Sequence, residues 1–415
     1  MGKFTWSEGN QGIYRYSDFG RFDLTEIDSD GATLFYDNSD NDFDPSRAPW
    51  KIELIFKDAE TYTFETGPDA GTEVFTDGTI TGIKIYNQDG DLVIKGTGLD
   101  ASLAIVSARL LDDGDLDGLW KFINAGGHTY VGSNDSSGPD NDWDGDSIST
   151  GRGDDTIKGN GGNDYIEDRG GVDTYNGGAG WDTVSYNTGD SYWDGWAVGI
   201  DANLKTGKVT GYDDKIDTLK NIESIRGTAF KDKFTGDKND NEFMGYQGKD
   251  DINGAGGWDR ASYRNDADRG GTDGIKADLK KGYVRDGFGQ KDTIKNIEEI
   301  DGTDSNDVFI DNNKSNHFRG RDGDDKMTFS KGNDSGYGEE GADTFIFKGN
   351  NFGYDSIWDF DQDEGDKIKI NNANSLDDLI IYQEGDHTVI KFNDNAFVQL
   401  DHIWFEDISA SDFIF

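Results

Sequence analysis

The chain has 415 residues, but hydrophobic side chains make up only 33% of it and 58 residues are glycine. Lysine and arginine number 40 against 84 aspartate and glutamate residues, which gives a formal net charge of −44. This charge excludes nucleic acid and anionic lipid as partners and favours cations. The 25 Phe, 17 Tyr and 10 Trp argue against permanent disorder, so we expect a β-rich protein that folds when counterions neutralise it.

Residues 1–122 are predicted to form an N-terminal β domain. Short runs such as 51–56 (KIELIF) and 81–86 (TGIKIY) alternate apolar and polar residues between Gly, Asn and Asp turns, which is typical of antiparallel strands. Residues 99–124 change period and predict two short amphipathic helices. The first residues, 1–8 (MGKFTWSE), have no apolar stretch of a Sec-type signal, and no run is apolar enough for membrane insertion.

A nine-residue repeat begins near residue 123 and continues to residue 346. It occurs in three blocks, 123–185, 227–262 and 302–346, separated by inserts at 186–226 and 263–301. Fourteen copies share one register, and twelve of them carry Asp at the sixth position. The sixth-position residues are Asp146, Asp155, Asp164, Asp173, Asp182, Asp232, Asn241, Asp250, Asp259, Asp307, Asn316, Asp325, Asp334 and Asp343.

Each nonapeptide has the composition of a glycine-rich turn followed by a short strand. If two nonapeptides make one coil, residues 18 positions apart stack, and the sequence then contains eight stacked pairs at the sixth position. One apolar residue per strand, at the eighth position, is too thin a core for this chain, so the turns must supply stability. Stacked carboxylates and backbone carbonyls make an all-oxygen site, which favours Ca²⁺ over Mg²⁺ or Zn²⁺. About eight Ca²⁺ ions are therefore expected.

The copies resemble the GGxGxDxUx repeats of RTX (repeats-in-toxin, hemolysin-type) secreted proteins, whose parallel β-roll binds calcium in its turns. This resemblance implies that the sixth-position residues are calcium ligands and that carbonyls of the glycine turns complete the shell. The implied glycine positions are Gly151, Gly153, Gly162, Gly171, Gly178, Gly180, Gly248, Gly257, Gly323 and Gly341. Asn241 and Asn316 depart from the pattern, so weak or absent sites are expected there. The fold class is thus all-β, a calcium-bound β-roll between an N-terminal antiparallel β domain and a C-terminal β cap.

Residues 347–415 resemble the closing segment of RTX proteins that are exported by type I secretion. The segments concerned are 355–361 (DSIWDFD), 364–370 (EGDKIKI) and 409–415 (SASDFIF). The same alternating residues also suit strands that cap an open roll edge. We expect both roles, with the type I secretion machinery as a partner and a secreted, extracellular or cell-surface location.

No catalytic motif stands out. Residues 113–118 (DGDLDG) and 140–145 (DNDWDG) open like EF-hand loops, but Asn124 and Gly151 occupy the positions where the loop requires Glu. The sequence contains neither HExxH nor GxSxG, while its carboxylates are too numerous to single out an acid and base pair.

The sequence therefore predicts a non-enzymatic, extracellular calcium-binding protein with a structural role in a surface layer, biofilm matrix or adhesion. Such a protein would self-associate in calcium or bind cell-surface or matrix polysaccharide. A polysaccharide-active epimerase or lyase carrying an RTX roll is the alternative, with its site in the first 122 residues or in the insert loops. A pore-forming toxin is disfavoured because no segment is suited to cross a bilayer.

Overall fold

The computed structural model of the chain describes residues 2–6, 22–28, 31–36, 51–63, 73–86, 92–102, 128–131, 147–150, 153–187, 198–211 and 215–415. The chain forms two compact units. The first unit comprises residues 1–189 and 207–222, and the second comprises residues 190–206 and 223–415. No helix within the described ranges is long and apolar enough to span a lipid bilayer.

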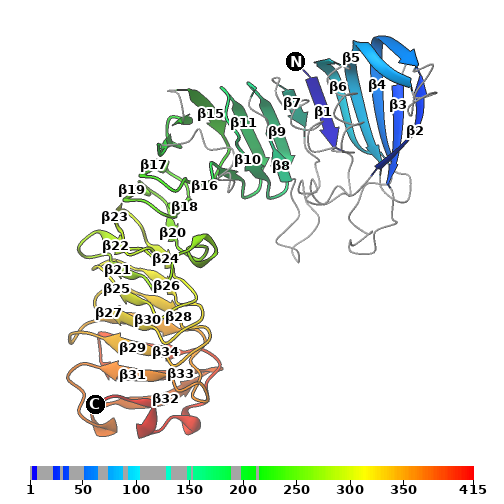
Figure 1. Cartoon of the computed structure of the whole chain (residues 1–415). Coiled ribbons are helices and arrows are strands. Elements are labelled where there is room, and N and C mark those ends of the chain that lie inside the picture. Colours follow the sequence, from blue (N-terminus) through cyan, green and yellow to red (C-terminus); the bar gives the residue numbers. More distant parts are fainter. Residues whose placement is uncertain are drawn as a thin grey trace. The chain divides into compact units, whose positions relative to one another are not determined.

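The first unit opens with an antiparallel sheet (Figure 1). Its hydrogen-bonded order is β2–β3–β4–β5–β6–β1. This agrees with the predicted N-terminal β domain. The strands are β1 (Gly2–Trp6), β2 (Phe22–Asp28), β3 (Gly31–Tyr36), β4 (Lys51–Thr63), β5 (Glu73–Tyr86) and β6 (Leu92–Ser102).

The prediction of a helical pair at 99–124 is wrong for residues 99–102, because these residues lie in β6, which pairs with β5. Tertiary pairing within the sheet outweighs the local helical period at these residues. The remainder of the predicted pair, from residue 103 on, lies outside the described residues.

A parallel roll follows in the same unit. One ladder runs β1–β7–β9–β11–β15, and the facing ladder runs β8–β10–β12. Ile148 pairs with Ile166, and Ile166 pairs with Val184, so successive coils are offset by 18 residues as predicted. The strands are β7 (His128–Val131), β8 (Ser147–Ser149), β9 (Thr156–Gly161), β10 (Tyr165–Glu167), β11 (Thr174–Ala179), β12 (Thr183–Ser185), β14 (Lys208–Thr210) and β15 (Ile216–Lys220).

In the second unit one face of the roll runs β13–β17–β19–β23 and continues β21–β25–β27–β29–β31. The second insert joins these two runs through β22, which pairs antiparallel with both β23 and β21. The strands are β13 (Asp201–Asn203), β17 (Lys233–Thr235), β19 (Asp251–Asn253), β21 (Lys276–Asp278), β22 (Tyr283–Arg285), β23 (Lys291–Lys295), β25 (Val308–Ile310), β27 (Lys326–Phe329), β29 (Thr344–Phe347) and β31 (Lys367–Ile370).

The opposite face of the second unit runs β16–β18–β20–β24–β26–β28–β30–β34 and ends in the antiparallel strands β33 and β32. Its strands are β16 (Ser224–Arg226), β18 (Glu242–Met244), β20 (Arg260–Ser262), β24 (Glu299–Asp301), β26 (His317–Arg319), β28 (Ser335–Tyr337), β30 (Gly353–Ile357), β32 (Ile380–Glu384), β33 (His387–Asn393) and β34 (Ala396–Leu400).

The core lies between the two faces, with one inward apolar residue on most of the short strands and two on β27, β29 and β31. Eighth-position side chains such as Ile166, Phe309 and Phe318 are buried, because alternate residues of a strand point to the same side. Phe309 and Phe318 stack with ring centroids 5.2 Å apart, and Phe318 and Phe329 are 5.7 Å apart. Offset aromatic stacks fill the narrow space between the faces.

The C-terminal residues close the end of the roll. The Ile414 N–H donates to the Ile368 carbonyl of β31, and the Phe413 side chain is buried. A short 3₁₀ turn at Leu376–Asp378 connects β31 to β32, and two more, at Phe405–Asp407 and Ala410–Asp412, follow the last strand. Hydrogen bonding is thus continuous across both predicted domain limits, at residue 122 through β1–β7–β9 and at residue 346 through β29–β31.

Candidate metal centre

The sixth-position carboxylates form rows along the roll. Each sixth residue stands just before a strand, as Asp325 stands before β27. The Asp325 Oδ1 accepts the Asp307 N–H at 2.7 Å, and the Asp343 Oδ1 accepts the Asp325 N–H at 2.8 Å. The same contact recurs in the pairs 155/173, 164/182, 232/250, 241/259 and 316/334. Seven of the eight predicted pairs therefore stack, and the eighth, 146/164, includes a residue outside the described ranges.

The second oxygen of several of these carboxylates has no partner among the described residues. The Oδ2 atoms of Asp250, Asp259, Asp325, Asp334 and Asp343 are buried and accept no hydrogen bond. A buried carboxylate oxygen without a donor is costly for the fold. A cation at each such oxygen removes this cost, so we call these five turns the open turns.

The first residue of the repeat provides room for the sixth-position carboxylate. A Cβ atom on Gly320 would meet both the Asp325 Oδ2 and the carbonyl oxygen of Gly338 one coil later. Gly302, Gly245 and Gly254 likewise have the Oδ2 of their own sixth-position Asp where a Cβ would stand. At Gly320, Gly302 and Gly254 a backbone carbonyl oxygen also lies close to this position, so a carboxylate and a carbonyl converge where another residue would place its side chain.

The fourth residue of the repeat brings the turns close together. Gly323 and Gly341 have φ values of 119° and 135°, a region that favours glycine. A Cβ on Gly341 would touch the Gly323 carbonyl oxygen of the preceding coil. The predicted residues Gly162, Gly171, Gly180 and Gly257 share this positive φ, as does Gly178 at a second position. The resulting donor set is entirely oxygen, which fits Ca²⁺.

Burial without a counterion raises the pKa of these carboxyl groups. Desolvation, together with the charges of neighbouring carboxylates, raises the pKa of Asp250, Asp325 and Asp334 to about 9. Without calcium, the carboxyl groups of these turns therefore favour the protonated form. Calcium would take the place of these protons.

Four predicted ligands are instead satisfied by protein groups, and we call their turns the closed turns. The Asp307 Oδ2 accepts the Thr303 N–H at 2.7 Å, and its Oδ1 accepts the Thr303 hydroxyl at 2.9 Å. Asp232 makes the same two contacts with Thr228. Burial raises the pKa of Asp232 and Asp307 only to about 7, because these donors oppose it.

The other two closed turns carry asparagine. The Asn241 Oδ1 accepts the Asp237 N–H at 2.8 Å, and its Nδ2 donates to the Glu223 carbonyl at 3.5 Å. The Asn316 side chain contacts Asn312 N and the Glu298 carbonyl in the same way, at 3.1 and 3.4 Å. In these two turns the amide nitrogen of asparagine donates a hydrogen bond. In an open turn the corresponding atom is a carboxylate oxygen that accepts none.

Sequence reasoning missed four carboxylates that continue the rows. Asp217 and Asp292 accept the N–H of Asp173 and Asp250 at 2.8 and 2.9 Å, from strands of the two inserts. Asp355 and Asp366 do the same for Asp334 and Asp343 near the C-terminus. Their spacings of 44, 42, 21 and 23 residues hide them from an 18-residue search. The recurrence of DTLKN at 217 as DTIKN at 292 was the available signal.

The remaining predicted residues are placed as follows. Asp146 and Gly151 lie outside the described residues. Asp155, Asp164, Asp173 and Asp182 are buried in the coils of the first unit. Gly153 offers its carbonyl oxygen to the space beside Gly171, and Gly248 lies against the Asp250 Oδ1 and the Phe230 carbonyl.

Comparison with known protein families agrees with the repeat pattern. The sequence profile of the RTX calcium-binding nonapeptide repeat (4 copies) matches residues 140–175, 149–184, 225–261 and 301–336. No curated protein is a significant match to the chain.

Solved structures with some similarity include the extracellular lipase LipA from Serratia marcescens, at 17% identity and a TM-score of 0.19. That match covers 70% of this chain and 40% of the lipase, so the chain spans less than half of the lipase's length. The AlgE6R3 subunit of the Azotobacter vinelandii mannuronan C5-epimerase matches at 18% identity and a TM-score of 0.19, over 45% of this chain and 78% of the subunit. The chain thus carries RTX calcium-binding nonapeptide repeats, and these repeats form a parallel β-roll.

Proposed function

We propose that this chain is an exported, non-catalytic structural protein that folds on calcium and then self-associates at a cell surface or in an extracellular matrix. The observation that carries the proposal is the row of buried Oδ2 atoms in the open turns. These oxygens couple folding to an ion, because the calcium-free coils hold unpaired carboxylates. Sites built from such turns suit the high calcium concentrations outside cells.

The C-terminus supports export. Residues 409–415 dock on β31 through the Ile414 N–H and the buried Phe413 ring. This segment is accessible to a type I secretion machinery only before the roll forms. Calcium-coupled folding therefore keeps the export signal free inside the cell and buries part of it outside.

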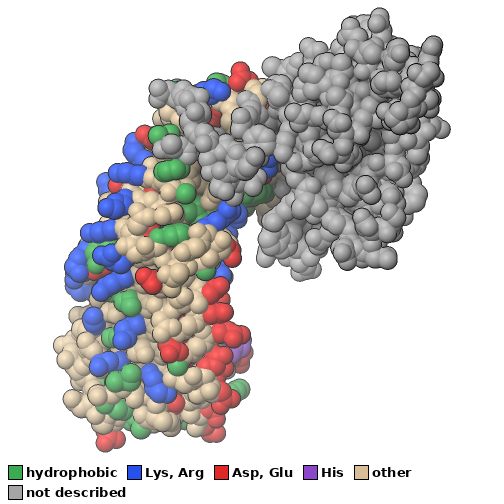
Figure 2. All heavy atoms as spheres, viewed as in Figure 1, with side chains coloured by type: hydrophobic (Ala, Val, Ile, Leu, Met, Phe, Trp, Pro, Cys, Tyr) green, Lys and Arg blue, Asp and Glu red, His purple; other side chains and the backbone are tan. Residues whose placement is uncertain are grey.

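The surface of the second unit supports self-association. Figure 2 shows Asp and Glu side chains gathered along one side of this unit, with Lys and Arg side chains on another. Lys276, Arg285 and Lys291 are exposed and lie directly opposite one another on β21, β22 and β23. Like charges in cross-strand register are unfavourable unless an anionic partner compensates them. We name these three residues the basic ladder, and the acidic side of a second copy is a suitable partner for it.

Light scattering during a calcium titration at 150 mM salt tests the proposal. We expect particle size to rise after the circular dichroism change is complete, and Lys276→Glu with Lys291→Glu to fold normally but stay monomeric. Lys348→Glu, an exposed lysine outside the ladder, is the matched control and should assemble. A wild-type monomer at saturating calcium would contradict self-association. If that monomer also released unsaturated or epimerised sugar from an acidic polysaccharide, the chain would be an enzyme.

Truncation tests the export route. Deleting about 60 C-terminal residues should retain the protein inside cells that carry a type I system, because the proposed signal lies there. Deleting the N-terminal strands β1 to β3 should leave export intact and serves as the control. Normal secretion of the C-terminal truncation would contradict type I export.

A further inference from the structure

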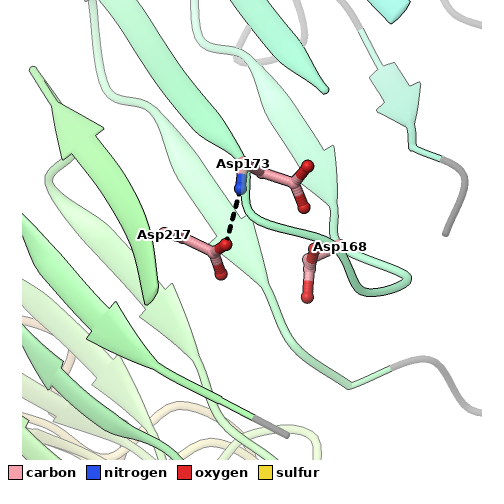
Figure 3. A group of neighbouring side chains, drawn as sticks. All are labelled: Asp168, Asp173 and Asp217. Carbon is pink, nitrogen blue, oxygen red and sulfur yellow. Dashed lines mark hydrogen bonds between the residues drawn. The ribbon is translucent and has the colours of Figure 1, made fainter. Parts of the chain in front are cut away.

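A second kind of acidic cluster lies where the coils of the first unit meet the first insert (Figure 3). Asp168 follows β10, Asp173 precedes β11 and Asp217 lies in β15. All three side chains are buried, and one carboxylate oxygen from each lies within 4.8 Å of the others. Three segments of the chain thus bring their carboxylates to one point.

Asp168 distinguishes this cluster from the other turns. It is the first residue of the nonapeptide 168–176, whereas the adjoining copies begin with Gly159 and Gly177. In the usual turn that position contributes no side chain to the space beside the sixth-position carboxylate. Here it adds a third carboxylate to the stacked pair formed by Asp173 and Asp217.

Protein donors do not satisfy the cluster. The Tyr175 hydroxyl lies 2.6 Å from the Asp168 Oδ1 and 2.9 Å from the Asp173 Oδ2, but it has only one proton to donate. The Gly170 N–H reaches the Asp168 Oδ1 at 3.2 Å, and the Tyr186 hydroxyl reaches the Asp217 Oδ2 at 3.3 Å. The Asp168 Oδ2 is buried and accepts no hydrogen bond.

The charge of the cluster has little compensation, since Lys215 acts on Asp217 only from beyond ion-pair distance. No described lysine or arginine forms an ion pair with any of the three carboxylates. Desolvation and the neighbouring carboxylates raise the pKa of Asp173 to about 9 and that of Asp217 to about 7. Three like charges at this depth require a cation or protons.

We propose that Asp168, Asp173 and Asp217 bind one Ca²⁺ ion, and bind it more tightly than the two-carboxylate turns of the roll. Ca²⁺ takes six to eight oxygen ligands in a flexible geometry, which suits carboxylates from three separate segments, whereas Mg²⁺ demands a near-ideal octahedron and gives up its water reluctantly. The third carboxylate raises affinity because calcium sites are tuned by ligand charge. The ion would fasten the coil at 168–176 to β15 across the insert. This inference does not depend on the proposed extracellular role.

Counting bound ions at buffered free calcium tests the proposal. The full-length protein is dialysed to equilibrium over a range of free Ca²⁺, and calcium per chain is measured by elemental mass spectrometry. At the lowest free calcium that loads any site, the wild type should hold one ion that Asp168→Asn and Asp168→Gly lack. Asp168→Gly restores the first residue of the adjoining repeats, so it keeps the fold, which circular dichroism at saturating calcium verifies.

Asp311→Asn is the matched control. Asp311 is also a buried first-position aspartate, but Ser330 occupies both of its oxygens, through its N–H at 2.6 Å and its hydroxyl at 2.8 Å. This variant should match the wild type at low calcium. Equal ion counts for wild type and Asp168→Gly at every calcium concentration would overturn the proposal, and so would the same loss in Asp311→Asn. Replacing calcium by magnesium in the dialysis should leave the site empty, and loading by magnesium would overturn the assignment to Ca²⁺.

Discussion

The open and closed turns of the second unit share one backbone path but differ in what satisfies their sixth residue. In the open turn at Asp325 the Oδ2 has no donor among the described residues. In the closed turn at Asp307, one coil earlier, Thr303 supplies two donors to the same carboxylate. An aspartate at the sixth position is therefore not sufficient to make a cation site. The backbone N–H of the second residue, which donates to the Oδ2 in the closed turn, decides whether that oxygen remains available.

The position of the closed turns adds to this comparison. The two threonine-closed turns are the first copies after each insert, 227–235 and 302–310. Each block of the second unit thus begins with two closed turns, one with threonine and one with asparagine, and continues with open turns. We expect each such pair of closed turns to be a calcium-independent start for the coils that follow.

Calcium removal should produce the largest effect. Without calcium the open turns keep buried charges, so the β signal of the roll in circular dichroism should be largely lost, and millimolar Ca²⁺ should restore it. Magnesium at the same concentration is the control and should not restore it. A thermal melt unchanged by EGTA would show that the open turns do not depend on ions.

Acidification should have the next largest effect on the calcium-free chain. Folded pKa values near 9 for Asp250, Asp325 and Asp334 exceed the usual 3.8, so the fold is most stable below about pH 4 and loses stability as pH rises toward 9. Each such carboxyl contributes about 1.4 kcal/mol per pH unit within that window. Chelator-treated protein should therefore melt at a higher temperature at pH 5 than at pH 8. With calcium the trend should reverse, because protons compete for the ligands.

Substitution of single carboxylates compares the two kinds of turn directly. Asp325→Ala should raise the calcium midpoint of folding about tenfold or more, because it removes an open ligand. Asp307→Ala should leave the midpoint nearly unchanged and lower the unfolding free energy by about 1 to 3 kcal/mol at saturating calcium, because it leaves the Thr303 donors unpaired. Equal shifts in the calcium midpoint of folding for Asp325→Ala and Asp307→Ala would contradict the distinction between open and closed turns.

The space at the first glycine can be tested by filling it. Gly320→Ala places a Cβ against the Asp325 Oδ2 and the Gly338 carbonyl, so it should cost about 1 to 3 kcal/mol at saturating calcium. Gly256→Ala is the matched control, since a Cβ there would meet only the Asp237 carbonyl oxygen, at 4.0 Å. Denaturant unfolding measures both variants, and similar losses would refute a tight first position.

Thr303→Val should produce the smallest effect. It removes the hydroxyl donor to Asp307 but keeps the backbone N–H, so about 1 kcal/mol of stability should be lost. Because the backbone N–H still occupies the Asp307 Oδ2 and the Ile275 N–H still occupies its Oδ1, the variant should respond to calcium as the wild type does. A stronger calcium response than that of the wild type would mean that the threonine hydroxyl itself keeps the turn closed.

The repeat period allowed the roll, its 18-residue offset and the position of its carboxylate rows to be predicted, because nine residues fix both the turn and the inward strand residue. Asp217 and Asp355 were not predicted as ligands because the inserts and the C-terminal coil change the spacing of 18 residues. Each nevertheless accepts a backbone N–H as the predicted carboxylates do. The role of Thr303 was not predicted, because the sequence does not show that its N–H and hydroxyl donate to Asp307 in the folded turn. The EF-hand-like segments at 113–118 and 140–145 and the implied ligands Asp146 and Gly151 lie outside the described residues.

The pairing of β1 with β7 has a consequence for the order in which the molecule folds. Gly2 pairs with His128, whereas each coil of the roll closes over 18 residues. Loop-closure entropy grows with the logarithm of loop length, so the longer closure costs about 1.7 kcal/mol more than one coil. Short closures can add one after another along the roll, while the β1–β7 contact forms efficiently only when β7 already has a neighbour in β9. The N-terminal edge should therefore be the last part of the first unit to close and the first to reopen.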